Sequence, residues 1–310
     1  MAEHDGRIPV ILDTDIGSDI DDTWALGMLL KSPELDTKLV VSDEGDTVYR
    51  AALIARVLEC AGRSDIPVGV GMRREEKPGP QQPWLEGYTV SDYHGEVRED
   101  GIQAIIDTIM ASEQPITLIC IGPTPNIAKA LEREPGIASR ARFVGMHGSF
   151  NWSHMTGKQE PEYNVYADAP ACRAALEAPW MSARITPLDT CGRIVLDGAR
   201  YQRLLQSDDP LLGAVLDNYR TWAKAHPGVD PSARSTTLFD TVAIYLAFAD
   251  ELCRMERMGV RVTDDGRTVR DDTGALLDVA LEWKDKEAFL DLLTERMLAP
   301  VLAAASGGSH

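Results

Sequence analysis

The sequence predicts an α/β fold: an open, mainly parallel, Rossmann-like sheet with helices on both faces, extended by a small C-terminal β-hairpin and helical addition. Two patterns support this prediction. Short apolar runs alternate with segments of helical periodicity over about 190 residues, which is typical of parallel strands joined by helices. The last third then changes to short strands joined by DDG and DTG turns, and a helix follows them.

The elements follow in chain order. The apolar run IPVIL predicts a buried strand at residues 8–12, and apolar residues at helical spacing predict a helix at 22–30. The alternation continues with strands at 38–41, 67–71, 116–121, 142–146 and 184–188, and with helices at 50–60, 102–110 and 126–131. In the last third we expect helices at 201–205, 211–225, 240–249 and 286–298, and strands at 260–263, 268–270 and 277–281. Residues 1–302 are expected to form one domain, and the small, polar residues 303–310 a disordered tail.

Composition excludes several classes of function. With 31 Lys and Arg against 49 Asp and Glu, the formal net charge is −18, which repels both nucleic acid and anionic membranes. No apolar run approaches the roughly 20 residues that a membrane span needs. The five cysteines are odd in number and widely spaced, which argues against a disulfide framework or a zinc site. No secretory signal is visible, so a cytoplasmic location is expected.

Polar residues follow several of the predicted strands. They form the blocks 13–22, after the first strand, and 42–46, after the second, and they recur at Gly122, Asn126, His147 and Gly148. Because the carboxyl ends of parallel strands meet at one edge of a sheet, where ligands bind, this recurrence predicts a functional site there.

The block 13–22 holds five aspartates and no Lys or Arg. Neighbouring carboxylates repel each other, and a bound cation removes that repulsion. Oxygen ligands favour Ca²⁺ or Mg²⁺. Helix capping alone could explain Asp21 and Asp22, but it does not explain Asp13 and Asp15 at the end of a buried strand. The block therefore predicts a metal site.

Two enzyme families begin with a strand and then Asp-x-Asp. In the haloacid dehalogenase-like phosphatases a Thr or Val follows, where this chain has Gly17. The inosine–uridine-preferring nucleoside hydrolases open with D-x-D-x-G, a short gap, D-D and a helix, which this sequence resembles more closely. The resemblance extends over about residues 8–300 through Gly45-Asp46, residues 121–128, Met146-His147-Gly148, Glu162-Tyr163-Asn164 and Phe239-Asp240.

This resemblance implies Ca²⁺-dependent hydrolysis of the N-glycosidic bond of ribonucleosides through an oxocarbenium-like transition state. It implies that Asp15 is the general base and that the metal ligands are Asp15, Asp22, Asp240 and the main-chain carbonyl of Ile121. It also implies a homodimer or homotetramer acting on a small-molecule nucleoside. The residues it implies for the substrate are Asp21, Asp46, Met146, Glu162 and Asn164.

Some positions leave alternatives open. The segment between Asp15 and Asp21 is two residues longer than in better-known family members, so its extra carboxylate, Asp19, is an alternative ligand. Phe239 stands where some purine-cleaving members have a His, which favours pyrimidine or non-purine-specific substrates. His94, in a Tyr-His-Gly motif, is a candidate catalytic residue near the base, and His147 and His154 are further candidates. The same site could instead act on an unusual ribosyl compound or bind ribose without catalysis.

Overall fold

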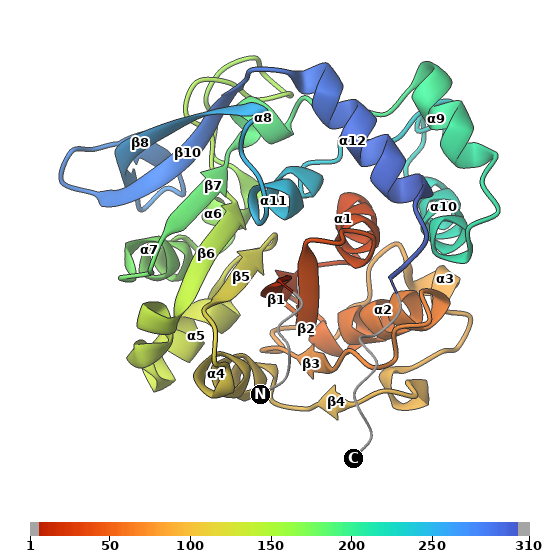
Figure 1. The fold of residues 1–310 in the computed structure, drawn as a ribbon, viewed down its shortest axis with the longest axis horizontal. Coiled ribbons are helices and arrows are strands. Elements are labelled where there is room, and N and C mark those ends of the chain that lie inside the picture. Colours follow the sequence, from red (N-terminus) through yellow and green to blue (C-terminus); the bar gives the residue numbers. More distant parts are fainter. Residues whose placement is uncertain (1–5, 303–310) are drawn as a thin grey trace.

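A ten-stranded sheet forms the centre of the molecule, and its strand order is β4-β3-β2-β1-β5-β6-β7-β10-β8-β9 (Figure 1). The computed structural model describes residues 6–302; the predicted tail at 303–310 lies outside them. The strands are β1 (Ile8–Thr14), β2 (Leu35–Ser42), β3 (Val68–Val70), β4 (Val97–Arg98), β5 (Ile116–Cys120), β6 (Ala141–Met146), β7 (Ala183–Thr186), β8 (Cys253–Val262), β9 (Thr268–Arg270) and β10 (Ala275–Trp283).

All neighbouring strands from β4 to β10 pair in parallel, whereas β8 is antiparallel to both β10 and β9. This confirms the predicted fold class. The C-terminal strands are joined to the main sheet, because β10 pairs with β7. Strand β10 has a largely apolar sequence, so its side chains can be buried on both sides of the sheet.

The connecting helices lie on both sides of the sheet. They are α1 (Asp21–Leu30), α2 (Thr47–Cys60), α3 (Gln82–Leu85), α4 (Gly101–Ala111), α5 (Pro125–Arg133), α6 (Tyr163–Tyr166), α7 (Ala169–Glu177), α8 (Leu188–Cys191), α9 (Gly198–Leu205), α10 (Pro210–Ala223), α11 (Thr241–Leu246) and α12 (Lys286–Leu298). Two short 3₁₀ helices, η1 (Val90–Asp92) and η2 (Pro135–Arg140), complete the connections. Helices α4, α5 and α7 cover one face, and α1, α2 and α11 cover the other (Figure 1).

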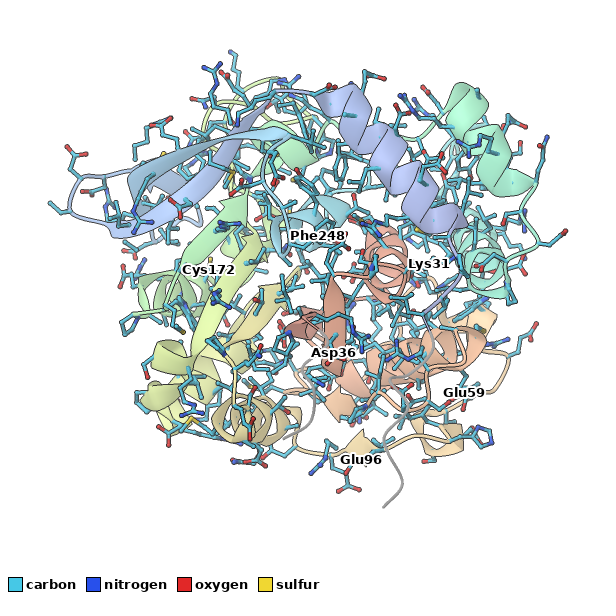
Figure 2. The ribbon with its side chains drawn as sticks, in the orientation of Figure 1. Lys31, Asp36, Glu59, Glu96, Cys172 and Phe248 are labelled. Atoms are coloured by element: carbon cyan, nitrogen blue, oxygen red, sulfur yellow. The ribbon has the colours of Figure 1, made fainter. Side chains whose placement is uncertain are left out.

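The second face carries an additional layer, because α9, α10 and α12 pack outside α1 and α2. Helix α1 is therefore buried along its whole length. Its Trp24 is fully buried between Tyr201 and Tyr219, with ring centroids 6.4 Å from each. Lys31, just after α1, is also buried, and its ammonium group donates to Asp209 and to the Met297 carbonyl (Figure 2). This packing fixes the position of α1, whose first turn contributes to the site described next.

Among the described residues, 6–302, no helix is long and apolar enough to cross a membrane.

Candidate active site

A pocket of about 660 Å³ opens at the carboxyl ends of the central strands. The chain runs outward from β1 through β2, β3 and β4, and then returns to place β5 on the other side of β1. This reversal makes a topological switch point, where parallel sheets bind ligands. Asp15 follows β1 and Ile121 follows β5, so both line the pocket at that point. Its other polar lining residues are Ser18, Asp19, Asp21, Asp22, His154, Glu160, Glu162, Asn164 and Asp240.

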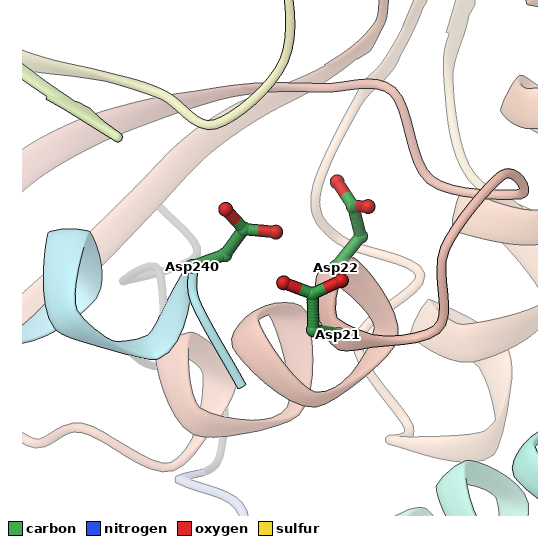
Figure 3. Close-up of side chains that lie close together, drawn as sticks. All are labelled: Asp21, Asp22 and Asp240. Atoms are coloured by element: carbon green, nitrogen blue, oxygen red, sulfur yellow. The ribbon is translucent and has the colours of Figure 1, made fainter. Parts of the chain in front are cut away.

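Three buried carboxylates meet at the base of this pocket. Asp21 and Asp22 form the first turn of α1, and Asp240 is the residue before α11 (Figure 3). Each offers an oxygen that lies within 4.8 Å of the other two. Helices α1 and α11 pack together, so their N-terminal ends present these groups to one space. The helix dipoles favour negative charge there, and the Asp240 side chain does not cap its own helix but interacts with Asp21 instead.

The electrostatics of the cluster fit a hard divalent cation. Burial and the neighbouring carboxylates hold the pKa values of Asp22 and Asp240 well above their usual range. Burial and the charge of Asp19 raise the pKa of Asp21 to about 7. Each carboxylate thus disfavours ionisation of the others, and a cation would reverse that effect. Since all three donors are carboxylate oxygens, the set suits Ca²⁺ or Mg²⁺ better than zinc.

Asp15 lies beside this cluster but is not one of its three members. Its charge raises the pKa values of both Asp22 and Asp240, which places it within electrostatic reach of each. Burial raises the pKa of Asp15 itself to about 6, although the Arg50 guanidinium lowers it. Gly122 packs against Asp15 so closely that a Cβ there would lie 2.8 Å from its Oδ1. Asp15 is therefore held in place, with an ionisable oxygen facing the pocket.

Arg50 organises the loop that carries Asp15. Its guanidinium donates to the carbonyls of Asp15 and Ile16 and to the Ser18 hydroxyl, and its Nε donates to the Glu44 carbonyl. The loop is also held farther along, where Trp222 Nε1 donates to the Ser18 carbonyl over 2.8 Å. These contacts fix the backbone of residues 16–20, the lengthened segment between Asp15 and Asp21.

On the opposite wall, the predicted Glu162 and Asn164 lie side by side at the start of α6. The Glu162 carboxylate accepts hydrogen bonds from the backbone N–H groups of Gly148, Asn164 and Val165, and burial raises its pKa to about 7. Asn164 Nδ2 donates to the carbonyl of Ile121, 3.0 Å away, and to that of Met146, also 3.0 Å away.

Most of the predicted site residues thus line one pocket. These are Asp15, Asp21, Asp22, Ile121, Met146, Glu162, Asn164 and Asp240.

Two predicted residues are not brought to this pocket. His94 follows η1 in the long connection after β3; its side chain is 84% exposed and its Nδ1 lies 2.6 Å from Glu59. Glu59, near the end of α2, is at the periphery of the molecule (Figure 2). Asp46 is used to cap α2, where it accepts from the Tyr49 N–H, and it pairs with Arg73. Neither His94 nor Asp46 lines the pocket, and their contact with a substrate stays a prediction.

The two other candidate histidines, His147 and His154, lie in different surroundings. His147 is fully buried against Phe143, and burial lowers its pKa to about 4, so it stays neutral in the core. His154 lines the pocket and contacts Phe239 edge-on.

The sequence analysis did not identify Glu160, Tyr163 and Tyr166, which also line the pocket. Tyr163 is the central residue of the Glu-Tyr-Asn motif, and Glu160 and Tyr166 lie within two residues of it, so this proximity was the available signal.

The fold and the site together define an α/β enzyme that binds a small molecule beside a carboxylate cluster at the switch point of its sheet. The chain belongs to the inosine-uridine preferring nucleoside hydrolase family, whose family model matches residues 10–291. It is accordingly a hydrolase of N-glycosyl compounds.

Its similarity to individual proteins covers nearly the whole chain. The chain is 27% identical to the pyrimidine-specific ribonucleoside hydrolase RihA of Salmonella arizonae, covering 94% of this chain and 98% of the relative. It is 26% identical to RihA of an Enterobacter species, covering 94% and 97%. Among solved structures, a plant nucleoside hydrolase, PpNRh1, superposes with a TM-score of 0.78 at 24% identity, covering 94% of this chain and 99% of that one. An inosine-uridine preferring nucleoside hydrolase of Bacillus anthracis gives 0.75 at 19%, with the same coverage.

Proposed function

We propose that this protein hydrolyses ribonucleosides to the free base and ribose in a Ca²⁺-dependent reaction, with a preference for pyrimidine or non-purine bases. The observation that carries the proposal is the buried, oxygen-only cluster of Asp21, Asp22 and Asp240 beside Asp15 in a pocket of about 660 Å³. That volume is in the range of small-molecule sites.

The cation would be held by Asp22 and Asp240, with Asp15 and the Ile121 carbonyl beside them. When bound, such an ion lowers the pKa of coordinated water and attracts vicinal hydroxyl groups. Asp15 would accept the proton of the attacking water, a role that suits a carboxylate whose pKa lies near 6. Asp21 would accept a hydrogen bond from a ribose hydroxyl.

Asn164 and Glu162 would complete the sugar site. Asn164 would accept a hydrogen bond from a second ribose hydroxyl through its amide oxygen, since the carbonyls of Ile121 and Met146 hold its Nδ2 group and so fix the orientation of the amide. Glu162 and Met146 would lie near the 5′ side of the sugar. Tyr163 and Phe239, which also line the pocket, provide flat apolar surface for a base.

The base preference rests on two considerations. Relatives at 26% and 27% identity are named as pyrimidine-specific. Phe239, directly before Asp240, cannot donate a proton, and purine-cleaving relatives in some cases have a histidine there. A specific feature also supports the alternative of an unusual ribosyl substrate: Asp19 and Glu160 add two carboxylates to the pocket beyond those needed for metal and ribose. The family assignment gives no support to the phosphatase alternative.

The decisive experiment measures reducing sugar released from a panel of uridine, cytidine, inosine and adenosine, with added Ca²⁺ and with chelator. We expect release of ribose with Ca²⁺, fastest for a pyrimidine nucleoside, and its loss in chelator. Asp15→Asn is expected to lower kcat by about 10²–10⁴-fold or more while the melting temperature changes little. Full activity in chelator, or a normal rate for Asp15→Asn, would refute the metal dependence or the assignment of the base, respectively.

The homodimeric or homotetrameric state and the cytoplasmic location stay predictions from the sequence; sedimentation of the purified protein and cell fractionation test them.

A further inference from the structure

Breaking the bond between ribose and base requires more than an activated water. The electron pair of that bond stays on the departing base, and a base that leaves unprotonated is a poor leaving group, so a proton donor on the base side accelerates the reaction. Phe239 has no proton to give, and His94 is bound to Glu59 at the periphery. Another residue of the pocket must therefore supply this proton or the step goes unassisted.

His154 occupies the required region. It lines the same pocket as Asp15 and Asp240, and its imidazole packs edge-on against Phe239 with ring centroids 4.9 Å apart and an interplanar angle of 61°. Phe239 is the neighbour of Asp240 in the chain, and His154, Phe239 and Asp240 all line this pocket. Its side chain is accessible from the pocket, so a ligand can reach the ring nitrogens.

The loop that carries His154 is anchored at both ends. At its start, the backbone N–H groups of Phe150 and Asn151 each donate to the Asp189 carboxylate over 2.9 Å. At its end, Gln159 Nε2 donates to the carbonyls of Ser149 and Thr268. Within the loop, the hydroxyl of Ser153, next to His154, bonds to Glu160. These contacts fix the loop that presents the imidazole to the pocket, and such support is what a proton donor requires.

Two carboxylates face this imidazole from different elements. Glu160 belongs to the same loop, and Asp19 belongs to the segment before α1, where Gln81 Nε2 holds its carbonyl at 2.7 Å. Loss of hydration lowers the pKa of His154 below its usual value, and the charges of Glu160 and Asp19 offset part of that decrease. His226 also faces Asp19, from the end of α10. Asp19 is thus the extra carboxylate of the lengthened segment, and it stabilises positive charge on His154.

We propose that His154 is the catalytic residue that protonates the departing base, with Asp19 and Glu160 as positioning residues that favour the imidazolium. The assignment rests on the nucleoside hydrolysis proposed above. As the bond from C1′ to the base nitrogen breaks, its electron pair stays on the base, and a proton moves from a ring nitrogen of His154 to that nitrogen or to a conjugated carbonyl oxygen. The water oxygen adds to C1′, and its proton passes to Asp15. Solvent then returns a proton to His154 and takes one from Asp15, so the products are ribose and a neutral base.

The test compares two leaving groups in one enzyme. His154→Gln and the wild type are assayed, with added Ca²⁺, on uridine and on 4-nitrophenyl β-D-ribofuranoside, whose nitrophenolate leaves without being protonated. We expect kcat for uridine to fall by about 10²–10⁴-fold in the variant and kcat for the nitrophenyl riboside to change little. Asp19→Asn is expected to produce a smaller loss with the same dependence on the leaving group. Circular dichroism and the melting temperature check that His154→Gln is folded, which its accessible position favours.

The alternatives give different results. Equal losses on both substrates would assign His154 a structural or binding role and overturn the proposal, as would an unchanged rate on uridine. A loss confined to uridine in His94→Gln, rather than in His154→Gln, would move the role to His94. If the wild type hydrolyses the nitrophenyl riboside but no nucleoside, the proposed substrate class fails while the site chemistry stands. Hydrolysis of neither substrate would refute the proposed function, and the role of His154 with it.

Discussion

Replacing Asp21 by asparagine is expected to stabilise the protein in the absence of metal, although it damages the site. In chelator, Asp21 is buried among Asp22, Asp240 and Asp15, and its pKa lies near 7 instead of 3.8. Each pKa unit corresponds to about 1.4 kcal/mol, so ionising Asp21 in the fold costs up to roughly 4 kcal/mol relative to the unfolded chain. Asparagine keeps the shape, carries no charge, and offers an N–H to Asp240. Because its amide stays buried, we expect a net gain of about 1–3 kcal/mol.

The sign of the pH dependence follows from the direction of the pKa difference. At low pH the carboxyl is protonated in both states and costs nothing. As the pH rises from 3.8 towards 7, the unfolded chain ionises first, so the wild type loses stability relative to the variant. Above about pH 7 the difference is complete. Adding Ca²⁺ should reverse it, because the wild type then gains more stability than the variant from the bound ion.

The assay is thermal unfolding of both proteins in chelator between about pH 5 and pH 8.5, and again with Ca²⁺. A gain of 1 kcal/mol corresponds to roughly 2–4 °C in a chain of this size class. Asp208→Asn, at an exposed position near the end of α9, is the matched control for removing one negative charge. Two results would show that these carboxylates do not form a cation site. One is that Asp21→Asn is no more stable than the wild type in chelator at about pH 8, and the other is that Ca²⁺ stabilises both proteins equally.

Three further substitutions test how the site is supported. Gly122→Ala would place a Cβ 2.8 Å from Asp15 Oδ1, so we expect kcat to fall by about 10–100-fold with little change in melting temperature; wild-type kcat would contradict this. Glu162→Gln can no longer accept from backbone N–H groups with both oxygens, and urea unfolding should show a loss of about 1–3 kcal/mol; an unchanged midpoint would argue against the buried hydrogen bonds. Arg50→Lys keeps the charge but loses the forked contacts to the loop after β1, so the melting temperature and kcat should both fall; retention of both would show that charge alone suffices.

The sequence predicted most strands and helices because their signals are local. The helix predicted at 286–298 coincides with α12 (Lys286–Leu298), and the strand predicted at 8–12 lies within β1 (Ile8–Thr14). By contrast α7 (Ala169–Glu177) was not predicted, although Asp168 caps it and Pro170 lies in its first turn. Its apolar residues are mostly alanines, so no run of large apolar side chains marks the helix in the sequence, although α7 packs against α5 in the structure.

The candidate site was predictable where the fold requires residues to converge. Asp15, Asp21 and Asp22 are close in the chain and follow the first strand, so any parallel sheet would bring them to one edge. Asp240 is remote in sequence, and only the resemblance to a family linked it to them. His94 and Asp46 lie outside the pocket for a related reason: a motif fixes the residue type, whereas the path of a long loop or the need to cap a helix decides where the side chain goes.

The same packing that stabilises the fold also assembles the proposed metal ligands. Helix α1 is held by Trp24 against α9 and α10 on its outer side, and its N-terminal end meets that of α11. This buried apolar contact offsets the repulsion among the carboxylates gathered there, which raises the pKa values of Asp22 and Asp240. Metal binding and folding are therefore coupled in both directions. A cation strengthens the junction of α1 with α11, and loosening that junction in the core disperses the ligands without any change to the site residues themselves.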